Sequence, residues 1–188
     1  MTVGRPREFD PGQVEDAAMR LFWEHGFDRV SISDVTAATG VNRRSIYDEF
    51  GSKEMLFDRA TQRYLAGPGG YLSEALTRPT AREVADAMVH GAADTVSGDP
   101  QGCLTVGDAP GLRELRDATV HQLAERFDPA VADGELAGVD TLVLARWIAA
   151  VCQGIAVQSR SGASHADLHA VAEMALAGWP ESDATMGP

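Results

Sequence analysis

The stretch Ser31–Phe50, SISDVTAATGVNRRSIYDEF, predicts two short helices joined by a tight turn. Ser31 and Asp34 have the spacing of a capping box, in which the two residues satisfy each other's backbone N–H groups at the start of a helix. Gly40 is the residue type that ends a helix in a left-handed turn. Two short helices joined by such a turn form the arrangement with which many proteins read DNA.

The second helix of this stretch carries adjacent arginines. Asn42 can cap it, and Ile46 and Phe50 lie on its apolar side. Arg43 and Arg44 lie on the other side, where guanidinium groups suit both phosphates and the O6 and N7 atoms of guanine in the major groove. The alternative for these residues alone is an ordinary helical hairpin with a solvated basic face.

The preceding segment favours a DNA-binding domain. Asp10 and Pro11 predict the start of a helix that ends at Gly26, so that three helices can enclose a small core. Ahead of this helix, Arg5 and Arg7 lie on an arm for which two interpretations stay open. The arm either reaches into a minor groove or is a disordered, soluble terminus.

Residues 17–60, AAMRLFWEHGFDRVSISDVTAATGVNRRSIYDEFGSKEMLFDRA, resemble the DNA-binding domain of TetR-type transcriptional repressors. The matching elements are LF..HGF at the end of the first helix, S..DV....G in the helix-turn segment, S.Y..F in the recognition helix and SKE.LF at the start of a fourth helix. The resemblance implies a homodimer in which a divergent helical domain follows this one, binds a small ligand and releases operator DNA.

The resemblance also implies roles for individual side chains. Ser31 and Ser33 correspond to phosphate contacts, and Tyr47 and Lys53 to phosphate anchors. With the capping residue and the N-terminal arm included, the candidate DNA-binding residues are Arg5, Arg7, Ser31, Ser33, Asn42, Arg43, Arg44, Ser45, Tyr47 and Lys53. Arg44 stands where a small residue or proline is common, so the operator sequence is not inherited from the family.

Charge and composition agree with a local DNA reader on an acidic body. The net charge is −12, of which residues 1–64 contribute only −2, from 9 basic and 11 acidic side chains. This balance argues against a nonspecific nucleic-acid coat. The chain has two cysteines without metal-ligand spacing, which indicates neither a disulfide scaffold nor a zinc site. The polar N-terminus shows no secretory signal, so we expect a cytoplasmic protein.

The whole chain is predicted to be all-α, with about nine helices and no strand pattern. A DNA-binding domain of residues 1–64 would precede a regulatory and dimerisation domain of residues 65–188. Beyond Tyr64 the expected helices are one through about Val96 capped by Thr80, a short one near Gly102, and long ones at about 112–127, 140–159 and 164–177. Arg146 and Gln153 interrupt the most apolar of these, which favours a buried helix over a membrane span.

The helices near 140–159 and 164–177 are the expected dimer interface. Small and apolar side chains share one side of each: Leu142, Ala145, Ala149, Cys152 and Ala156 on the first, and Leu168, Val171, Ala172, Ala175 and Leu176 on the second. Two such helices from each subunit could form a four-helix interface. The alternative is that both faces only complete the core of the monomer.

A pocket for an unknown small molecule is expected between the helices from Ala81 to Trp147. Its candidate lining residues are Met88, His90, Cys103, Leu123, Phe127 and Trp147. If Cys103 lies near a helix N-terminus, its thiol would react readily with oxidants or electrophiles, as in a redox or electrophile sensor. The alternative is an inert, buried cysteine.

No metal site, cofactor or enzymatic activity is predicted. His165 and His169 are four residues apart, a spacing at which two imidazoles could share a metal, but the sequence offers no third ligand nearby. We therefore expect this pair to be a surface or interface feature. No catalytic motif is present, which argues against an enzyme. The function predicted is a ligand-responsive DNA-binding repressor, and the alternative is an architectural DNA binder without a ligand.

Overall fold

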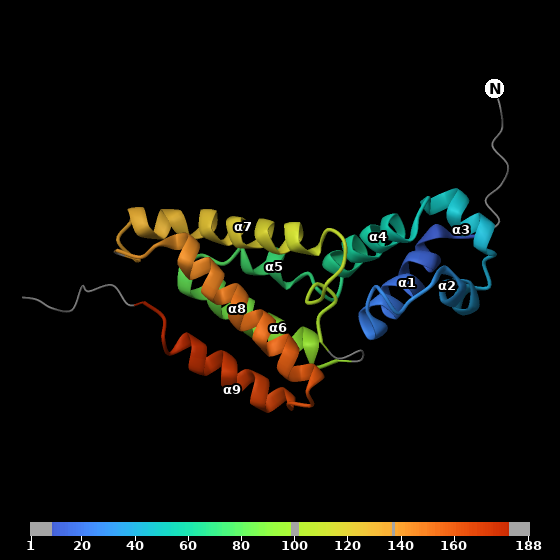
Figure 1. The fold of residues 1–188 in the computed structure, drawn as a ribbon. Coiled ribbons are helices and arrows are strands. Elements are labelled where there is room, and N and C mark those ends of the chain that lie inside the picture. Colours follow the sequence, from blue (N-terminus) through green and yellow to red (C-terminus); the bar gives the residue numbers. More distant parts are fainter. Residues whose placement is uncertain (1–8, 99–101, 137, 181–188) are drawn as a thin grey trace, which may run out of the picture.

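The computed structural model describes residues 9–98, 102–136 and 138–180, and these residues form nine α-helices and no strand. Helices α1–α4 lie at one end of an elongated molecule, and α5–α9 form a bundle at the other end (Figure 1). The helices are α1 (Pro11–His25), α2 (Ile32–Thr39), α3 (Arg43–Phe50), α4 (Lys53–Ala66), α5 (Tyr71–Ala75), α6 (Ala81–Val96), α7 (Leu112–Ala132), α8 (Thr141–Arg160) and α9 (His165–Leu176). The all-α prediction is confirmed.

The turn between α2 and α3 has the local structure that its residues predict. The side chain of Ser31 accepts a hydrogen bond from the backbone of Asp34, whose carboxylate bonds the backbone N–H of Ser31, and this completes the capping box. Gly40 ends α2 in the left-handed conformation at φ 71°. Asn42 Oδ1 accepts the backbone N–H of Ser45 at 2.9 Å and thereby caps α3. These caps fix the directions in which α2 and α3 leave the turn.

Aromatic side chains fill the core of the DNA-binding end. The ring centroid of Phe57, from α4, lies 5.1 Å from those of Phe22 and Phe27, in edge-on arrangements. Ile46 and Phe50 of α3 are buried, as their spacing predicts. With these two side chains α3 packs against α2 and α4, and its polar side stays outside.

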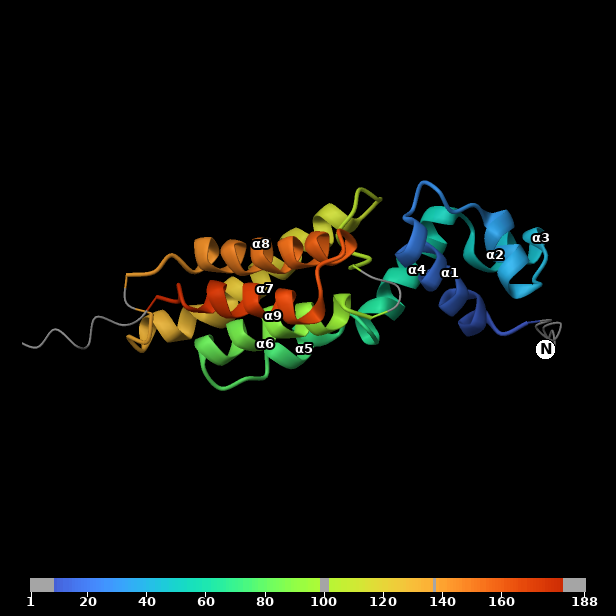
Figure 2. The same cartoon turned by 90° about the horizontal axis from the view of Figure 1, so that it is seen from below.

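The bundle is built around α8, which packs against α6, α7 and α9 (Figure 2). Among the described residues α8 is the one helix whose length and composition would allow it to cross a membrane. One side of this helix instead packs against three neighbouring helices, and Ala145, Ile148 and Ile155 on that side are fully enclosed. The helix is therefore the core element of the bundle, as the sequence predicts.

The prediction of a short helix near Gly102 is wrong. Residues 102–111 form turns and bends, and the short helix lies earlier, at α5 (Tyr71–Ala75). Gly102 has φ +86°, a conformation incompatible with an α-helix, and Arg160 lies so close that a Cβ on Gly102 would meet its side chain. Residues 102–111 are therefore held by tertiary contacts rather than by helical hydrogen bonds.

Candidate DNA interface and regulatory pocket

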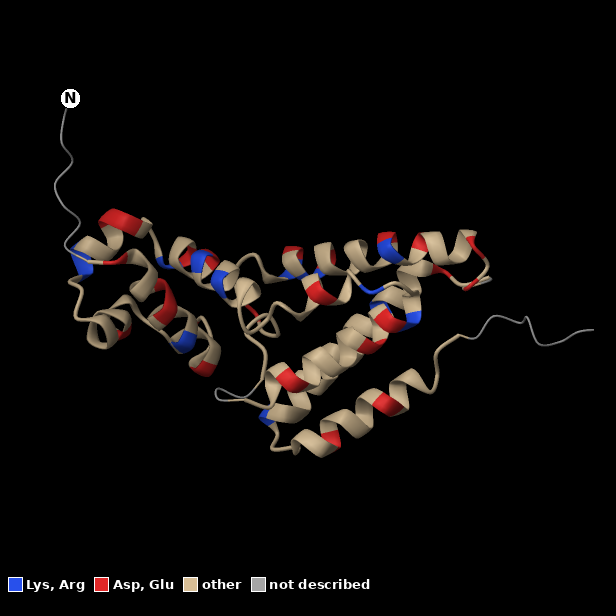
Figure 3. Ribbon diagram, turned by 180° about the vertical axis from the view of Figure 1, so that it is seen from behind, with Lys and Arg blue, Asp and Glu red and all other residues tan. Residues whose placement is uncertain are grey.

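The outer surface of α3 presents the predicted basic side chains. Arg43, Arg44 and Tyr47 are exposed, and Figure 3 shows basic residues at the tip of the molecule where α3 begins. The guanidinium carbon of Arg43 lies 5.5 Å from the centroid of the Tyr47 ring, and its Nη2 lies 3.4 Å from the hydroxyl oxygen. Arg44 extends further from the helix: its side chain is 91% exposed, with Nε 3.7 Å from Asp48 Oδ2.

The remaining candidates for DNA contact lie around the same surface. Ser31 and Asn42 are exposed but act as helix caps, so their side-chain oxygens are already engaged. Ser33 is exposed and Ser45 is half-buried. Lys53 begins α4, and its ammonium group lies 4.1 Å from the centroid of the Phe27 ring, a cation–π contact that fixes its position. Arg5 and Arg7 lie outside the described residues.

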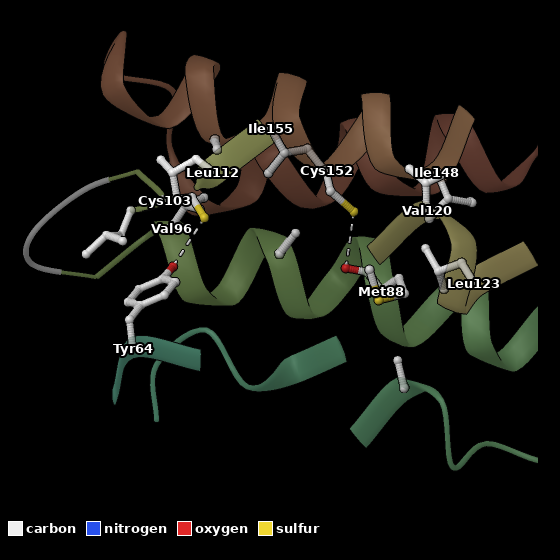
Figure 4. Close-up of a cluster of buried hydrophobic side chains, with 14 of the residues drawn as sticks. Tyr64, Met88, Val96, Cys103, Leu112, Val120, Leu123, Ile148, Cys152 and Ile155 are labelled. Atoms are coloured by element: carbon white, nitrogen blue, oxygen red, sulfur yellow. Dashed lines mark hydrogen bonds between the residues drawn. The ribbon is translucent and has the colours of Figure 1, made fainter. Parts of the chain in front are cut away.

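A small cavity of about 70 Å³ lies in the bundle where α4, α5, α6, α7 and α8 meet. Aliphatic side chains, two tyrosines, both cysteines and a few polar groups surround it. The lining residues are Tyr64, Leu65, Gly69, Tyr71, Leu72, Met88, Val96, Cys103, Thr105, Val106, Leu115, Arg116, Thr119, Ala149, Cys152 and Gln153. Figure 4 shows Tyr64, Met88, Cys103 and Cys152 in this part of the molecule. A mostly apolar wall with a few polar groups is typical of small-molecule sites.

Two of the six predicted pocket residues, Met88 and Cys103, line this cavity; the other four do not. Leu123 and Phe127 are fully buried, and the Phe127 ring packs edge-on against Trp179. Trp147 is half-buried near Gly178, and His90 faces α9. The sequence does not separate the two sets of residues, because an apolar helix face looks the same in sequence whether it meets another helix or a cavity.

The two cysteines differ in their surroundings. The hydroxyl of Tyr64 donates a hydrogen bond to Cys103 Sγ at 3.3 Å, and Thr105 Oγ1 lies 3.0 Å from the same sulfur. Burial raises the pKa of Cys152 to about 12, so this thiol stays protonated. Cys103 does not lie at a helix N-terminus, because α7 begins only at Leu112. The helix-dipole reason for a reactive Cys103 is therefore absent.

The loop after α6 connects the bundle to the DNA-binding end, a contact that the sequence did not predict. Trp23 Nε1, at the end of α1, donates a hydrogen bond to the carbonyl of Gly102 at 2.7 Å. From α8, Arg160 Nη2 reaches the carbonyl oxygens of Cys103 at 3.2 Å and Trp23 at 3.5 Å. The Trp23 ring also packs edge-on against Tyr64. The signal that could have indicated this contact is the large side chain of Trp23, three residues before the Gly26 that ends the helix.

The dimer faces predicted residue by residue require correction. Most of the residues named on α8 and α9 are buried inside the chain itself: Ala145, Cys152, Ala156, Leu168, Ala172 and Leu176. The apolar side chains that remain exposed are Val143 and Val157 on α8, and Val171 and Met174 on α9. Met174 is 77% exposed. The prediction selected the more apolar side of each helix, and that side is the one that completes the core.

Comparison with known proteins gives one family. Residues 15–60 match the bacterial regulatory proteins of the tetR family. The HTH-type transcriptional repressor ComR of Escherichia coli is 30% identical, over 95% of this chain and 92% of ComR. The HTH-type transcriptional repressor BdcR of the same organism is 29% identical, over 92% of this chain and 90% of BdcR.

A solved structure is similar over nearly the whole chain. The TetR family transcriptional regulator CifR, as a cysteine mutant complexed with 26-base-pair double-strand operator DNA, has a TM-score of 0.86 and 34% identity. The alignment covers 94% of this chain and 100% of that of CifR. The similarity therefore extends from the helix-turn-helix into α5–α9.

Proposed function

Because the chain belongs to the TetR family of transcriptional regulators, we propose that it is a homodimeric repressor which a small molecule releases from operator DNA. The observation that carries this proposal is the capped turn from α2 to α3. That turn leaves Arg43, Arg44 and Tyr47 exposed on one surface while the apolar side of α3 is buried. A helix held in this way can enter a major groove without rearrangement.

The DNA contacts are assigned by exposure and chemistry. We assign Arg44 to base reading, since a guanidinium group can bond guanine O6 and N7 in a bidentate manner. Tyr47 and Lys53 are assigned to phosphates, together with Arg43, Ser33 and Ser45, while Ser31 keeps its role as a helix cap. Most of the acidic charge lies on residues 65–188, which need not approach DNA. Operator affinity should therefore depend on this local basic surface and fall steeply with salt.

The exposed apolar residues of α8 and α9 support a homodimer. Val143 and Val157 on α8, and Val171 and Met174 on α9, are exposed, and the two helices pack against each other. A second copy packed on it would give a four-helix interface. The two α3 helices would then have to lie about 34 to 36 Å apart in order to read successive turns of one DNA face.

The cavity supports control by a small, mostly apolar molecule with one or two polar groups. Residues 1–64 are assigned to DNA binding and 65–188 to regulation, and α4 crosses this boundary. Tyr64, near the end of α4, lines the cavity, as does Cys103 in the loop beside Trp23. A ligand that displaces either residue would favour a spacing of the α3 helices that no longer fits the operator, and DNA affinity would fall by linkage.

A second candidate is a sensor version of the same regulator, in which Cys103 reacts with an oxidant or electrophile. It is favoured by the position of Sγ on the cavity wall, next to Tyr64 and Thr105. A molecule entering the cavity would meet this thiol directly. An adduct there would disturb the loop that contacts Trp23.

Selection from genomic DNA tests the repressor function. Purified protein is incubated with fragments of its source genome at near-physiological salt, and the retained fragments are sequenced. We expect a few enriched sites that share a two-fold symmetric motif, because a C2 dimer reads two half-sites. Uniform retention would instead indicate an architectural DNA binder and would contradict the proposal. The protein would act in the cytoplasm, where bacterial operator DNA lies.

A further inference from the structure

Four polar side chains converge where the last two turns of α6 meet the first turns of α9. Asp94 and His90 come from α6, and His165 and His169 from α9. The group lies outside the cavity beside Cys103 and on the bundle rather than on the DNA-binding end. The sequence had offered no third partner for the histidine pair, and folding supplies Asp94 from a helix more than seventy residues earlier.

Three atoms of this group form a nearly equilateral triangle. Asp94 Oδ1 lies 3.0 Å from His165 Nε2 and 2.9 Å from His169 Nε2. The two Nε2 atoms are 3.1 Å apart. Around tetrahedral Zn²⁺, with bonds of about 2.0 to 2.1 Å, neighbouring donor atoms lie about 3.3 Å apart. The triangle therefore has close to the size of one face of a zinc tetrahedron, with a carboxylate and two imidazoles as ligands.

His90 lies next to one of the two histidines of this triangle. Its Nε2 lies 3.3 Å from Glu173 Oε1, and its Nδ1 lies 2.7 Å from His169 Nδ1. A metal ion bound at His169 Nε2 would leave the proton of that ring on Nδ1, from which it can be donated to His90 Nδ1. The position of His90 therefore suits the tautomer of His169 that ligates through Nε2.

We propose that Asp94, His165 and His169 bind one divalent transition-metal ion of the Zn²⁺ type, with water as a fourth ligand. Three carboxylates, those of Asp86, Asp94 and Glu173, surround the histidines and favour a dication. The side chains of Asp94 and His165 are 63% and 60% exposed, so the ion can enter from solvent. His90 acts as a positioning residue, because a hydrogen bond at Nδ1 of a ligating histidine fixes its tautomer and ring.

The ion would join the end of α6 to the beginning of α9. Because the complete site exists only in the folded chain, metal binding should stabilise that chain by an amount that grows with the logarithm of the metal concentration above Kd. At a metal concentration about 100-fold above Kd, we expect the melting temperature to rise by about 5 °C or more. This effect is independent of DNA binding, so it holds or fails separately from the repressor function.

The test uses untagged, full-length protein stripped with a chelator and then given Zn²⁺ or Co²⁺. We expect one Zn²⁺ per chain by elemental analysis, the visible absorption of tetrahedral Co²⁺, and the rise in melting temperature. His169→Gln and Asp94→Asn should abolish all three. His121→Gln, at an exposed histidine of α7, is the matched control and should change none of them.

Variants of the positioning residue and the negative outcomes complete the test. His90→Gln should retain one ion per chain with an affinity about 10- to 100-fold weaker. If no metal were bound at micromolar Zn²⁺, the proposal would be overturned. The close contact between His165 Nε2 and His169 Nε2 would then be explained by a shared proton. Undiminished stoichiometric binding to Asp94→Asn and His169→Gln would overturn it too, because the ion would then lie elsewhere.

Discussion

Arg44 is the side chain of α3 best placed to distinguish base pairs. Its guanidinium group is almost fully exposed and is free to turn toward a groove, whereas Arg43 is stacked on Tyr47. We expect Arg44→Ala to lower operator affinity about 5- to 150-fold, corresponding to about 1 to 3 kcal/mol, and to relax the preference at one or two base positions. Fluorescence anisotropy with the operator and its single-base variants measures both effects.

Phosphate contacts should behave differently from Arg44 in the same assay. Tyr47→Ala and Lys53→Ala are expected to weaken binding to all sequences by similar factors and to reduce its salt dependence. Arg113→Ala, at an exposed arginine of α7, is the control and should have no effect. If all variants of α3 and α4 affected matched and mismatched sites equally, Arg44 would not be a base-reading residue.

Cys103 is the thiol that an electrophile entering the cavity would meet, since burial keeps Cys152 protonated with a pKa of about 12. If the sensor version is right, N-ethylmaleimide should release the protein from its operator, and Cys103→Ser should abolish this release while Cys152→Ser retains it. Electrophoretic mobility shift before and after treatment gives the result. An unchanged response in Cys103→Ser would dismiss the sensor.

At the scale of whole elements, the surface of α8 and α9 decides the assembly. A buried charge without a partner is strongly destabilising at an interface, so Val157→Arg combined with Met174→Arg should convert the dimer into a monomer. Light scattering coupled to gel filtration measures the mass. Met55→Arg is the matched control, because Met55 is 60% exposed but lies on α4. A dimer that persists in the double variant would place the interface elsewhere.

The helix caps should make the stability depend on pH. Hydrogen bonds from Ser31 lower the pKa of Asp34 below its ordinary value of 3.8. The charged cap is therefore fully formed above that value and is lost as the pH falls through the lower pKa of the folded state. We expect Asp34→Asn to lower the melting temperature at pH 7 and this difference to shrink below about pH 4.

Circular dichroism melts between pH 7 and pH 2 follow this effect. Asp117→Asn, at an exposed position inside α7 that caps no helix, serves as the control. A difference between Asp34→Asn and the native protein that stayed constant down to pH 2 would mean that the charge of Asp34 does not contribute to capping.

At the scale of the whole molecule, the Gly102–Cys103 loop links the two ends. Trp23→Phe keeps the ring contact with Tyr64 but leaves the buried Gly102 carbonyl without its partner, which should cost about 1 to 3 kcal/mol of unfolding free energy. Arg160→Met removes the second link to this loop. Both side chains hold the same loop. In a double-mutant cycle measured by urea unfolding, the loss of unfolding free energy in the double variant should therefore differ from the sum of the two single losses by at least about 0.5 kcal/mol.

A second double-mutant cycle, Trp179→Phe combined with Arg160→Met, is the control. Trp179 is also buried, but it packs against Phe127 rather than the loop. Its effect should simply add to that of Arg160→Met. Additivity within about 0.3 kcal/mol in the Trp23 cycle would show that the loop does not couple the two ends.

Local signals predicted the elements well. The pairs Ser31 and Asp34, and Ser164 and Asp167, form capping boxes as their spacing indicates, and α8 begins directly after Asp140. The recognition helix and its exposed basic surface followed from the same short stretch. The predicted short helix near Gly102 shows where local signals fail. Gly102 was interpreted as the start of a helix, although residues that are close to it in space impose a turn.

The all-α fold, the helix-turn-helix and the family could be predicted from the amino-acid sequence, because caps, turns and apolar spacing act between residues a few positions apart. The cavity, the exposed apolar residues of α8 and α9, the link from Trp23 to Arg160 and the group around Asp94 became visible only in the folded chain. Trp23 and Arg160 meet across 137 positions, and Asp94 and His169 across 75. Such contacts depend on how complete helices pack against each other, and identical apolar residues serve a core, a pocket or an interface.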